Sequence, residues 1–161
     1  MGADVVSLEE IENSAALGQP RDTALNTLVA ALNSAAGADT WAAVPSPTTV
    51  PTTGEDVIRT ALIYRPAKIA PVGTSTILDD PAFVNARAPL AQAFTQVDRP
   101  ASGKFVVIVN HFKSKGSGTG ANADQGDGQG ASNLSRKNQA TALVAFAEDV
   151  EANLPGPTRS S

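Results

Sequence analysis

A glutamate and a histidine in this sequence lie directly after predicted strands, where a strand end can present them to a ligand. The run from Val5 to Leu8 is short, apolar and rich in β-branched residues, which predicts a buried strand, and Glu10 follows it. His111, the one histidine, follows Phe105–Asn110, where five consecutive apolar residues predict a strand covered on both faces. A carboxylate there can bind a hard cation such as Mg²⁺, and a histidine can hydrogen-bond phosphate or transfer a proton.

Four basic residues could bind phosphate, and each also has a structural explanation. Lys113 and Lys115 follow His111 at alternate positions, as on a phosphate-facing edge, but any solvated loop carries such lysines. Arg65 and Arg87 lie near prolines at the edges of predicted strands. Their planar guanidinium groups suit bidentate phosphate contacts, whereas an ion pair with one of the 16 acidic residues is the structural alternative. Likewise, Glu10 could simply belong to a solvated strand end, and His111 could be a structural histidine. Spacing alone does not decide between these explanations and a functional site.

Hydrophobic periodicity predicts a mixture of strands and helices, as in an α/β fold. A first amphipathic helix begins at Asp22 or Thr23 and ends near Gly37, and a second begins at Asn133 or Ser135. The apolar face of the second helix is predicted to carry Ala140, Leu143, Val144, Ala147 and Val150. Between the helices we predict an extended segment over 41–53, strands Val57–Tyr64 and Lys68–Val72, an irregular segment over 74–87, a strand Pro89–Val97 and a hairpin turn over 98–103.

The segment Gly116–Gly130 holds six of the 13 glycines and is predicted to be a loop. A loop of this length inside a compact domain is either functional or disordered. It lacks the Gly-Lys-Ser/Thr ending of a P-loop and the spacing of a dinucleotide fingerprint. The chain also has no Gly-x-Ser-x-Gly nucleophile elbow, so these three kinds of site are excluded.

Length and composition limit the class of protein further. The 161 residues suffice for one domain with its own core, and the absence of cysteine excludes disulfides, thiolate-bound metals and a cysteine nucleophile. A net charge of −4 argues against nucleic-acid binding by bulk positive charge, although a local basic groove is compatible with it. No run approaches the roughly 18 apolar residues of a membrane span, and the first residues lack the pattern of a signal peptide.

Five blocks of sequence, taken in their order along the chain, resemble one family. They are VVSLEEIEN (5–13), DVIRTALIYRPAKIAPVG (56–73), ARAPLAQAF (86–94), FVVIVNHFKSKG (105–116) and DGQGASNLSRKNQATAL (127–143). The ordered set resembles the endonuclease/exonuclease/phosphatase superfamily, and most closely its bacterial extracellular nuclease branch, which is related to pancreatic deoxyribonuclease. Five blocks in one order are far more specific than any one of them.

The resemblance implies a fold and a set of roles. The fold is a four-layered α/β sandwich, here truncated, in which two largely antiparallel sheets lie between helices and the site lies at one end of the sheets. By resemblance, Glu10 holds the catalytic Mg²⁺, or Mn²⁺ or Ca²⁺ in its place. His111 contacts the scissile phosphate and supports acid–base chemistry, and Arg87 contacts the phosphate near the point of cleavage.

Further residues carry over from the family by position. Asp56 falls in the region from which relatives draw a carboxylate that orients the histidine. Tyr64 and Arg65 belong to a strand signature of the family, and the resemblance implies a structural role for both. The candidates for contacts with substrate phosphates are Lys113, Lys115 and Arg136.

Two family motifs are absent from these 161 residues: Gly-Asp-Phe-Asn, and Ser-Asp-His, which supplies the principal general-base histidine. We therefore interpret residues 1–154 as a partial endonuclease/exonuclease/phosphatase domain and residues 155–161 as a linker or disordered tail, and we expect the isolated chain to be inactive. The parent protein is expected to be a secreted, Mg²⁺-dependent endonuclease. Its expected substrate is DNA, or RNA as the second candidate, cut with little sequence preference, and the resemblance points to no membrane and no protein partner.

Two other functions remain open at the level of sequence. A phosphatase of the same superfamily, acting on phosphomonoesters or phosphoinositides, would share the same core and differ mainly in its loops. A non-catalytic relative that binds nucleic acid would keep the phosphate contacts without cleavage, and its binding would weaken as salt rises.

Overall fold

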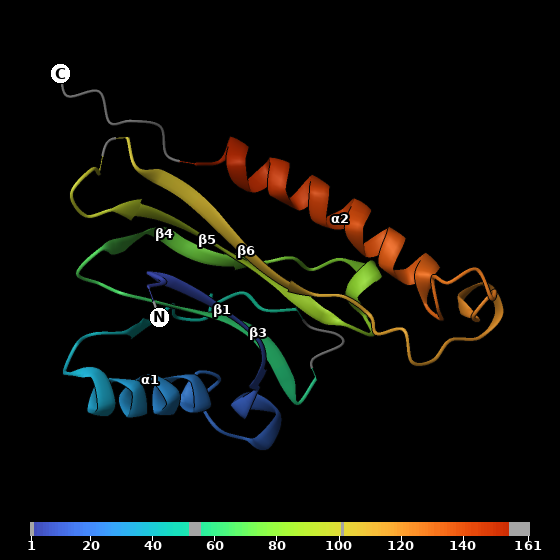
Figure 1. Cartoon of the computed structure of the whole chain (residues 1–161), viewed down its shortest axis with the longest axis horizontal. Helices are drawn as coiled ribbons and strands as arrows, with labels where there is room; N and C mark the ends of the chain where they lie inside the picture. Colours follow the sequence, from blue (N-terminus) through green and yellow to red (C-terminus); the bar gives the residue numbers. More distant parts are fainter. Residues whose placement is uncertain (1, 52–55, 101, 155–161) are drawn as a thin grey trace.

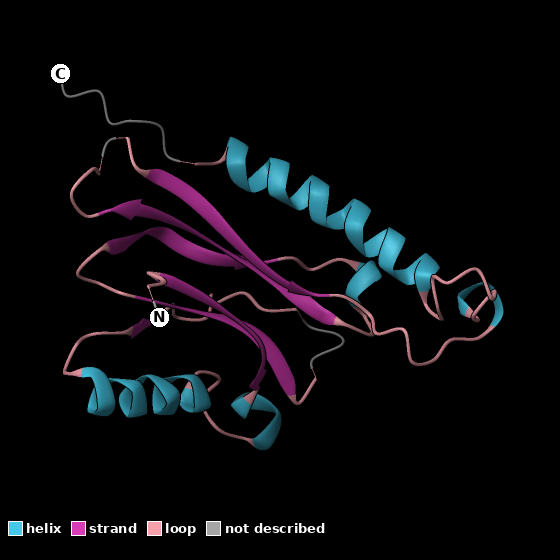
Figure 2. Cartoon of the chain, viewed as in Figure 1, coloured by secondary structure: helices cyan, strands magenta, loops and turns pink. Residues whose placement is uncertain are grey.

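The computed structural model describes residues 2–51, 56–100 and 102–154. These residues form a mixed α/β fold with two small antiparallel sheets and two α-helices (Figure 2). The first sheet has the order β1-β3-β2, with β1 at Val5–Glu12, β3 at Ile58–Tyr64 and β2 at Ala42–Ala43. The second has the order β4-β5-β6, with β4 at Ile69–Ile77, β5 at Arg87–Gln96 and β6 at Lys104–His111. The helices are α1, Thr23–Ala36, and α2, Asn133–Ala152, and the short 3₁₀ turns are η1, Ser14–Leu17, η2, Pro81–Phe83, and η3, Gly120–Asn122.

The two sheets pack against each other, with α1 beside the first sheet and α2 on the opposite side, beside the second (Figure 1). Strand β3 shows how one strand serves two cores, because alternate side chains point to opposite faces. Leu62 belongs to the core between the sheets, whereas Ala61 and Ile63 belong to a second core against α1. The buried members of the core between the sheets are Val44, Leu62, Ile69, Leu90, Phe94 and Val109.

The hydrophobic pattern predicted most elements to within about two residues at their ends. Both predicted helices are confirmed as α1 and α2, and the strands predicted at Val57–Tyr64, Pro89–Val97 and Phe105–Asn110 are confirmed as β3, β5 and β6. Leu25 on α1 is fully buried, as expected for the apolar face of that helix. The segment predicted as a linker, 155–161, lies outside the described residues. No described helix combines the length and the apolar character that crossing a membrane requires.

Strand β1 is longer than the sequence predicted, since it runs on to Glu12. Its pairing with β3 shifts between Leu8 and Ile11, and the backbone N–H of Asn13 donates to the carbonyl of Val57 at 2.8 Å. The glutamates are therefore part of the strand, in and after an irregularity in its register, and not a tail that follows it. A period-two pattern that is interrupted by such a shift is hard to recognise from sequence.

Strand β4 corrects a second prediction, because residues 74–77 are a strand and not the start of an irregular segment. The pairing of β4 with β5 shifts between Val72 and Thr76, and Gly73 has φ of +70°, a value that favours glycine. The sequence predicts that the strand ends at Val72, whereas in the structure the strand continues beyond the register shift. After it comes η2, where the carboxylate of Asp80 accepts a hydrogen bond from the Ala82 N–H at 2.8 Å.

Strands β1 and β6 contact each other and each ends its sheet, so that neither pairs on its outer side with another strand of the described residues. Strand β6 also contacts β3 of the first sheet and α2, so elements lie against both of its faces as predicted, but the cover is incomplete. Of its residues only Val109 is buried, and the others are partly exposed. An uncharged apolar run predicts burial, but it does not say whether a strand lies inside a sheet or at its edge.

The buried face of α2 also differs from the prediction. Gln139 is fully buried, whereas Val144, predicted on the apolar face, is 58% exposed and Ala140 is also exposed. Leu143, Ala147 and Val150 are partly buried, as expected from their spacing. The helix is therefore rotated about its axis relative to the prediction, and a glutamine occupies the position that lies deepest.

Candidate functional site

Four of the predicted site residues lie together where strands from both sheets end. Oε1 of Glu10, on β1, is 3.7 Å from Nδ1 of His111, the last residue of β6. His111 is the register partner of Arg87, the first residue of β5. Nη2 of Arg87 in turn lies 3.1 Å from Oδ2 of Asp56. Four side chains from segments that are distant in sequence thus lie next to one another. We call this set, Glu10, His111, Arg87 and Asp56, the candidate site.

Strand pairing explains why these residues meet. In an antiparallel pair the first residue of one strand lies opposite the last residue of the other, which places Arg87 beside His111. On the other side, β1 contacts β6, and Nδ1 of His111 lies 3.4 Å from the carbonyl oxygen of Glu9 as well as near Glu10. The irregular register of β1 therefore brings a backbone oxygen and a carboxylate to the same ring nitrogen.

Asp56 is held by its own backbone contacts. Its carbonyl accepts a hydrogen bond from the side-chain amide of Asn13 at 2.9 Å, and its Oδ1 accepts one from the N–H of Val57 at 2.7 Å. Its other carboxylate oxygen faces Arg87. Among the described contacts Asp56 is the partner of the arginine, and the groups that face His111 are Glu9 and Glu10.

The four side chains differ in exposure. Those of His111 and Arg87 are 22% and 21% exposed, whereas those of Asp56 and Glu10 are 44% and 62% exposed. Ion pairs with such exposed carboxylates are screened by water and contribute little to stability. The Nε of Arg87 is buried and makes no hydrogen bond within the described part of the chain. An arginine in such a partly exposed, weak pair can turn from its carboxylate to an anion at low cost.

The donor set at the candidate site limits what metal it could hold. Within residues 2–51, 56–100 and 102–154 no three acidic, histidine or cysteine side chains come together as a metal cage. Glu10 offers one exposed carboxylate beside His111. Magnesium commonly binds through one or two carboxylates, several waters and substrate phosphate oxygens. The residues present therefore fit a Mg²⁺ ion shared with a phosphate, and they do not fit a site made of protein ligands alone.

The predicted phosphate contacts Lys113, Lys115 and Arg136 lie on the segment after β6 and on α2. Nη1 of Arg136 donates to the carbonyl of Ala131 at 2.7 Å, and Nη2 donates to that of Gln129 at 2.8 Å. Arg136 therefore holds the end of the glycine-rich loop. Lys115 is exposed, and its side-chain stem runs past Gly130 at the end of the same loop, where an added Cβ would come within 3.2 Å of it.

Gln139 is a residue of this region that the sequence prediction missed. Its Oε1 accepts a hydrogen bond from the backbone N–H of Lys113 at 2.9 Å, and its Nε2 donates to the carbonyl of Ala82 at 2.9 Å. It thereby ties the segment that follows His111 to η2, which precedes Arg87. The rings of Phe83 and Phe112 lie 6.1 Å apart at the same junction. The sequence did carry a signal for Gln139, because it lies four positions before Leu143 and therefore on the apolar face of the predicted helix.

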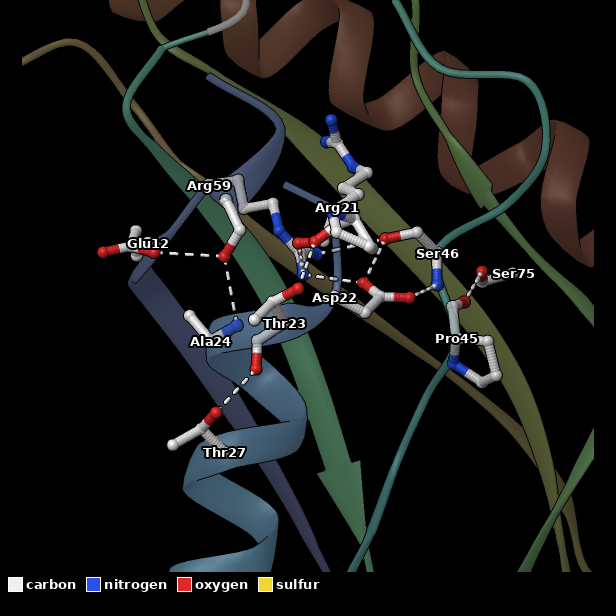
Figure 3. Close-up of polar contacts among 12 residues, drawn as sticks. Glu12, Arg21, Asp22, Thr23, Ala24, Thr27, Pro45, Ser46, Arg59 and Ser75 are labelled. Carbon is white, nitrogen blue, oxygen red and sulfur yellow. Dashed lines mark hydrogen bonds and ion pairs between the residues drawn. The ribbon is translucent and has the colours of Figure 1, made fainter. Parts of the chain in front are cut away.

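A second polar cluster, shown in Figure 3, fastens α1 to β3 and was also missed. Arg59 is 5% exposed, and its Nη2 donates to Oδ1 of Asp22 at 2.7 Å and to the carbonyl of Arg21 at 3.2 Å. Both oxygens of Asp22 accept hydrogen bonds from Ser46, at 2.6 and 2.9 Å. Asp22 is the N-cap residue of α1, but its side chain accepts no capping bond from the helix and serves this cluster instead.

Comparison with known proteins does not assign the chain to a family. Neither a scan against models of protein families nor a search of curated proteins finds a match to the chain.

Proposed function

We propose that this chain is part of a metal-dependent phosphodiesterase of the endonuclease/exonuclease/phosphatase type that acts on DNA, with RNA as the second candidate. The observation that carries the proposal is the meeting of Glu10, His111 and Arg87, from three strands of two sheets, with a separation of 3.7 Å between the glutamate and the histidine. The sequence blocks alone predict these three residues as parts of one site.

The arrangement of elements supports the same proposal. Helix α1, the first sheet, the second sheet and α2 follow one another through the molecule (Figure 1). This order is the one expected of the four-layered sandwich. The candidate site lies at strand ends, which is where the resemblance places the site of that fold.

Each residue has a chemical task in the proposed reaction. Arg87 binds a phosphate oxygen through its guanidinium group, which Asp56 orients, and neutralises negative charge there. His111 hydrogen-bonds a phosphate oxygen and acts there as a general acid–base group. Glu10 would hold Mg²⁺ together with the phosphate, and the ion, when bound, would supply further neutralisation of charge on the phosphate. Lys113 and Lys115 follow on the same segment as candidates for contacts with neighbouring phosphates.

The proposal is tested with the parent protein on supercoiled plasmid in Mg²⁺. His111→Ala and Arg87→Ala should each lower the rate of nicking by about 100-fold or more, because general acid–base groups and charge-stabilising donors typically contribute factors of this size. Arg99→Ala, at an exposed position in the turn between β5 and β6, is the matched control and should leave the rate unchanged. Unchanged cutting by His111→Ala would contradict the role of the histidine.

Two further measurements separate the alternatives. Hydrolysis of a phosphomonoester without nicking of plasmid would favour a phosphatase, and salt-dependent DNA binding without cleavage would favour a non-catalytic relative. The 161-residue chain lacks the two expected motifs, so it should bind phosphate without turnover. Mg²⁺-dependent nicking by carefully purified chain would contradict this expectation.

A further inference from the structure

A cavity of about 250 Å³ lies beside the candidate site. Arg87 and Asp56 form part of its lining, so the cavity and the candidate site share one ion pair. Cavities that hold drug-sized ligands measure roughly 300–1,000 Å³. This cavity is therefore of a size to hold one flat ring system, and too small to enclose a whole nucleotide.

The lining combines apolar walls with charged groups of both signs, since Arg21 and Arg59 line the cavity together with Arg87. Leu78, Phe83 and Val84 contribute apolar surface, with Phe83 buried and Val84 56% exposed. Asp79 and Asp80 contribute acidic groups. Oδ1 of Asp80 accepts the N–H of Ala82, which fixes that carboxylate relative to Phe83. Such a slot suits a flat heterocycle that carries an amino group, because the carboxylates accept hydrogen bonds from the amino group while the arginines can donate to ring nitrogens or carbonyl oxygens.

The position of Arg87 connects the cavity to the chain of a nucleic acid. A phosphate bound on this guanidinium group carries its sugar and base with it. Since Arg87 lines both the candidate site and the cavity, the base attached to that phosphate has the cavity within its reach.

We infer that the cavity takes one unstacked, amino-bearing nucleobase of the strand whose phosphate lies on Arg87. This inference rests on the proposed function and deepens it by naming a substrate class. A base in a duplex is stacked and paired, and it enters a pocket only when it is extruded or belongs to a single strand. The site therefore favours nucleic acid with unpaired bases. Cytosine, adenine and guanine are preferred to thymine, which has no exocyclic amino group to donate to the carboxylates.

The test is a titration of the ¹⁵N-labelled 161-residue chain, followed by amide chemical shifts, with four probes. Deoxycytidine 5′-monophosphate carries both phosphate and base, thymidine 5′-monophosphate carries the disfavoured base, deoxyribose 5-phosphate lacks a base, and deoxycytidine lacks the phosphate. Deoxycytidine 5′-monophosphate should bind about tenfold more tightly than either of the other two phosphates, a difference that one or two well-placed hydrogen bonds supply.

Matched variants locate the effect. Val84→Trp places an indole at an exposed position of the cavity wall and should remove the preference for the base while leaving deoxyribose 5-phosphate binding unchanged. Val97→Trp makes the same change at a 49% exposed position that does not line this cavity, and it should leave every affinity unchanged. Asp79→Ala should reduce the preference for cytosine over thymine.

The outcomes separate this inference from the proposed function. Equal affinity for deoxycytidine 5′-monophosphate and deoxyribose 5-phosphate overturns the base subsite and leaves the proposed function standing. Binding of deoxycytidine alone, equal to that of its phosphate and unaffected by Arg87→Ala, supports the cavity as a base site and contradicts the phosphate role of Arg87. Absence of binding by any base-bearing probe at millimolar concentration overturns the inference, and plasmid cutting by the parent protein decides the proposed function independently.

Discussion

Two arginine–aspartate pairs in this molecule have the same chemistry and opposite surroundings. Arg59 and Asp22 lie 2.7 Å apart, and their side chains are 6% and 24% exposed. Arg87 and Asp56 lie 3.1 Å apart, and their side chains are 21% and 44% exposed. In the first pair, hydrogen bonds from Ser46 engage both oxygens of the aspartate. In the second, one aspartate oxygen faces the arginine and the other accepts a hydrogen bond from the N–H of Val57.

The difference separates a structural pair from one available to a ligand. A buried pair is favourable only when its remaining donors and acceptors are satisfied, and such a pair has no capacity left for another molecule. The pair at the candidate site is more exposed, so an anion in solution can reach its arginine. Residue type alone would assign both arginines the same role, and matched substitutions of Arg59 and Arg87 test whether their surroundings give them different ones.

The largest effect on stability is expected from Arg59→Met. This change leaves the Asp22 carboxylate without its charged partner and should lower the free energy of unfolding by about 3 kcal/mol, the lower end for breaking a buried pair. Urea unfolding followed by fluorescence of the single tryptophan, Trp41, measures it. Arg65→Met is the control, because Arg65 and Asp4 form an exposed contact of 3.7 Å and the change should cost under about 0.5 kcal/mol. Equal losses in the two variants would contradict the distinction.

Gln139→Leu should have the next largest effect. It leaves the Lys113 N–H and the Ala82 carbonyl without their partner and should cost about 2 kcal/mol. Because Gln139 connects the segments that carry His111 and Arg87, hydrogen exchange at the Lys113 amide should also accelerate. Asn138→Leu, the same kind of change at an exposed neighbour on α2, should leave both measurements unchanged. Similar exchange rates in the two variants would show that Gln139 does not hold this junction.

Alkaline pH should reduce stability through a residue outside both pairs. Burial raises the pKa of the Tyr64 phenol above its usual value near 10, and its ring packs against Phe94 at 5.7 Å. The folded state then binds more protons than the unfolded state above pH 10. Stability contributed by the neutral phenol is complete below pH 10 and is lost as pH rises through the raised pKa.

Thermal unfolding of Tyr64→Phe and of the unchanged protein over this range measures that contribution. The variant should lose less stability than the unchanged protein between neutral and alkaline pH. An identical pH dependence in both proteins would assign the loss to other groups.

The smallest change in stability is expected from Arg87→Met, which repeats the substitution made at Arg59. The free energy of unfolding should fall by under about 1 kcal/mol, because the pair is partly exposed. Affinity for deoxyribose 5-phosphate should fall by about tenfold or more, since hydrogen bonds between charged groups contribute roughly 1.5–3 kcal/mol. A loss of stability as large as that of Arg59→Met would make Arg87 a second structural arginine.

The sequence predicts a feature well when the pattern that produces it lies within one short segment of the chain. The helix α1 and the strand β3 have regular apolar patterns, and both were predicted to within a residue or two. Glu10, His111, Arg87 and Asp56 were found through the order of sequence blocks, and the fold brings them together. The continuation of β4 past Gly73 was not found, because an irregular strand loses its period-two pattern.

Arg59 and Gln139 show why the remainder was missed. An arginine inside an apolar strand and a glutamine inside a helix have no distinctive local pattern. Their importance comes from partners 37 and 57 residues away in sequence, Asp22 and Ala82. Such pairings are fixed only when the elements pack, so a single sequence does not reveal them.

The open outer edges of β1 and β6 have a practical consequence for handling the protein. Strand β6 carries no charged residue between Lys104 and His111, and its outer backbone groups pair with no other strand of the described residues. Such an edge is a template on which further copies can add strands, and solubility then falls as concentration rises. Light scattering should increase steeply with protein concentration, and a lysine in place of Ile108 should suppress the increase. Strand β6, which positions the histidine, would thus also set the concentration at which the protein can be studied.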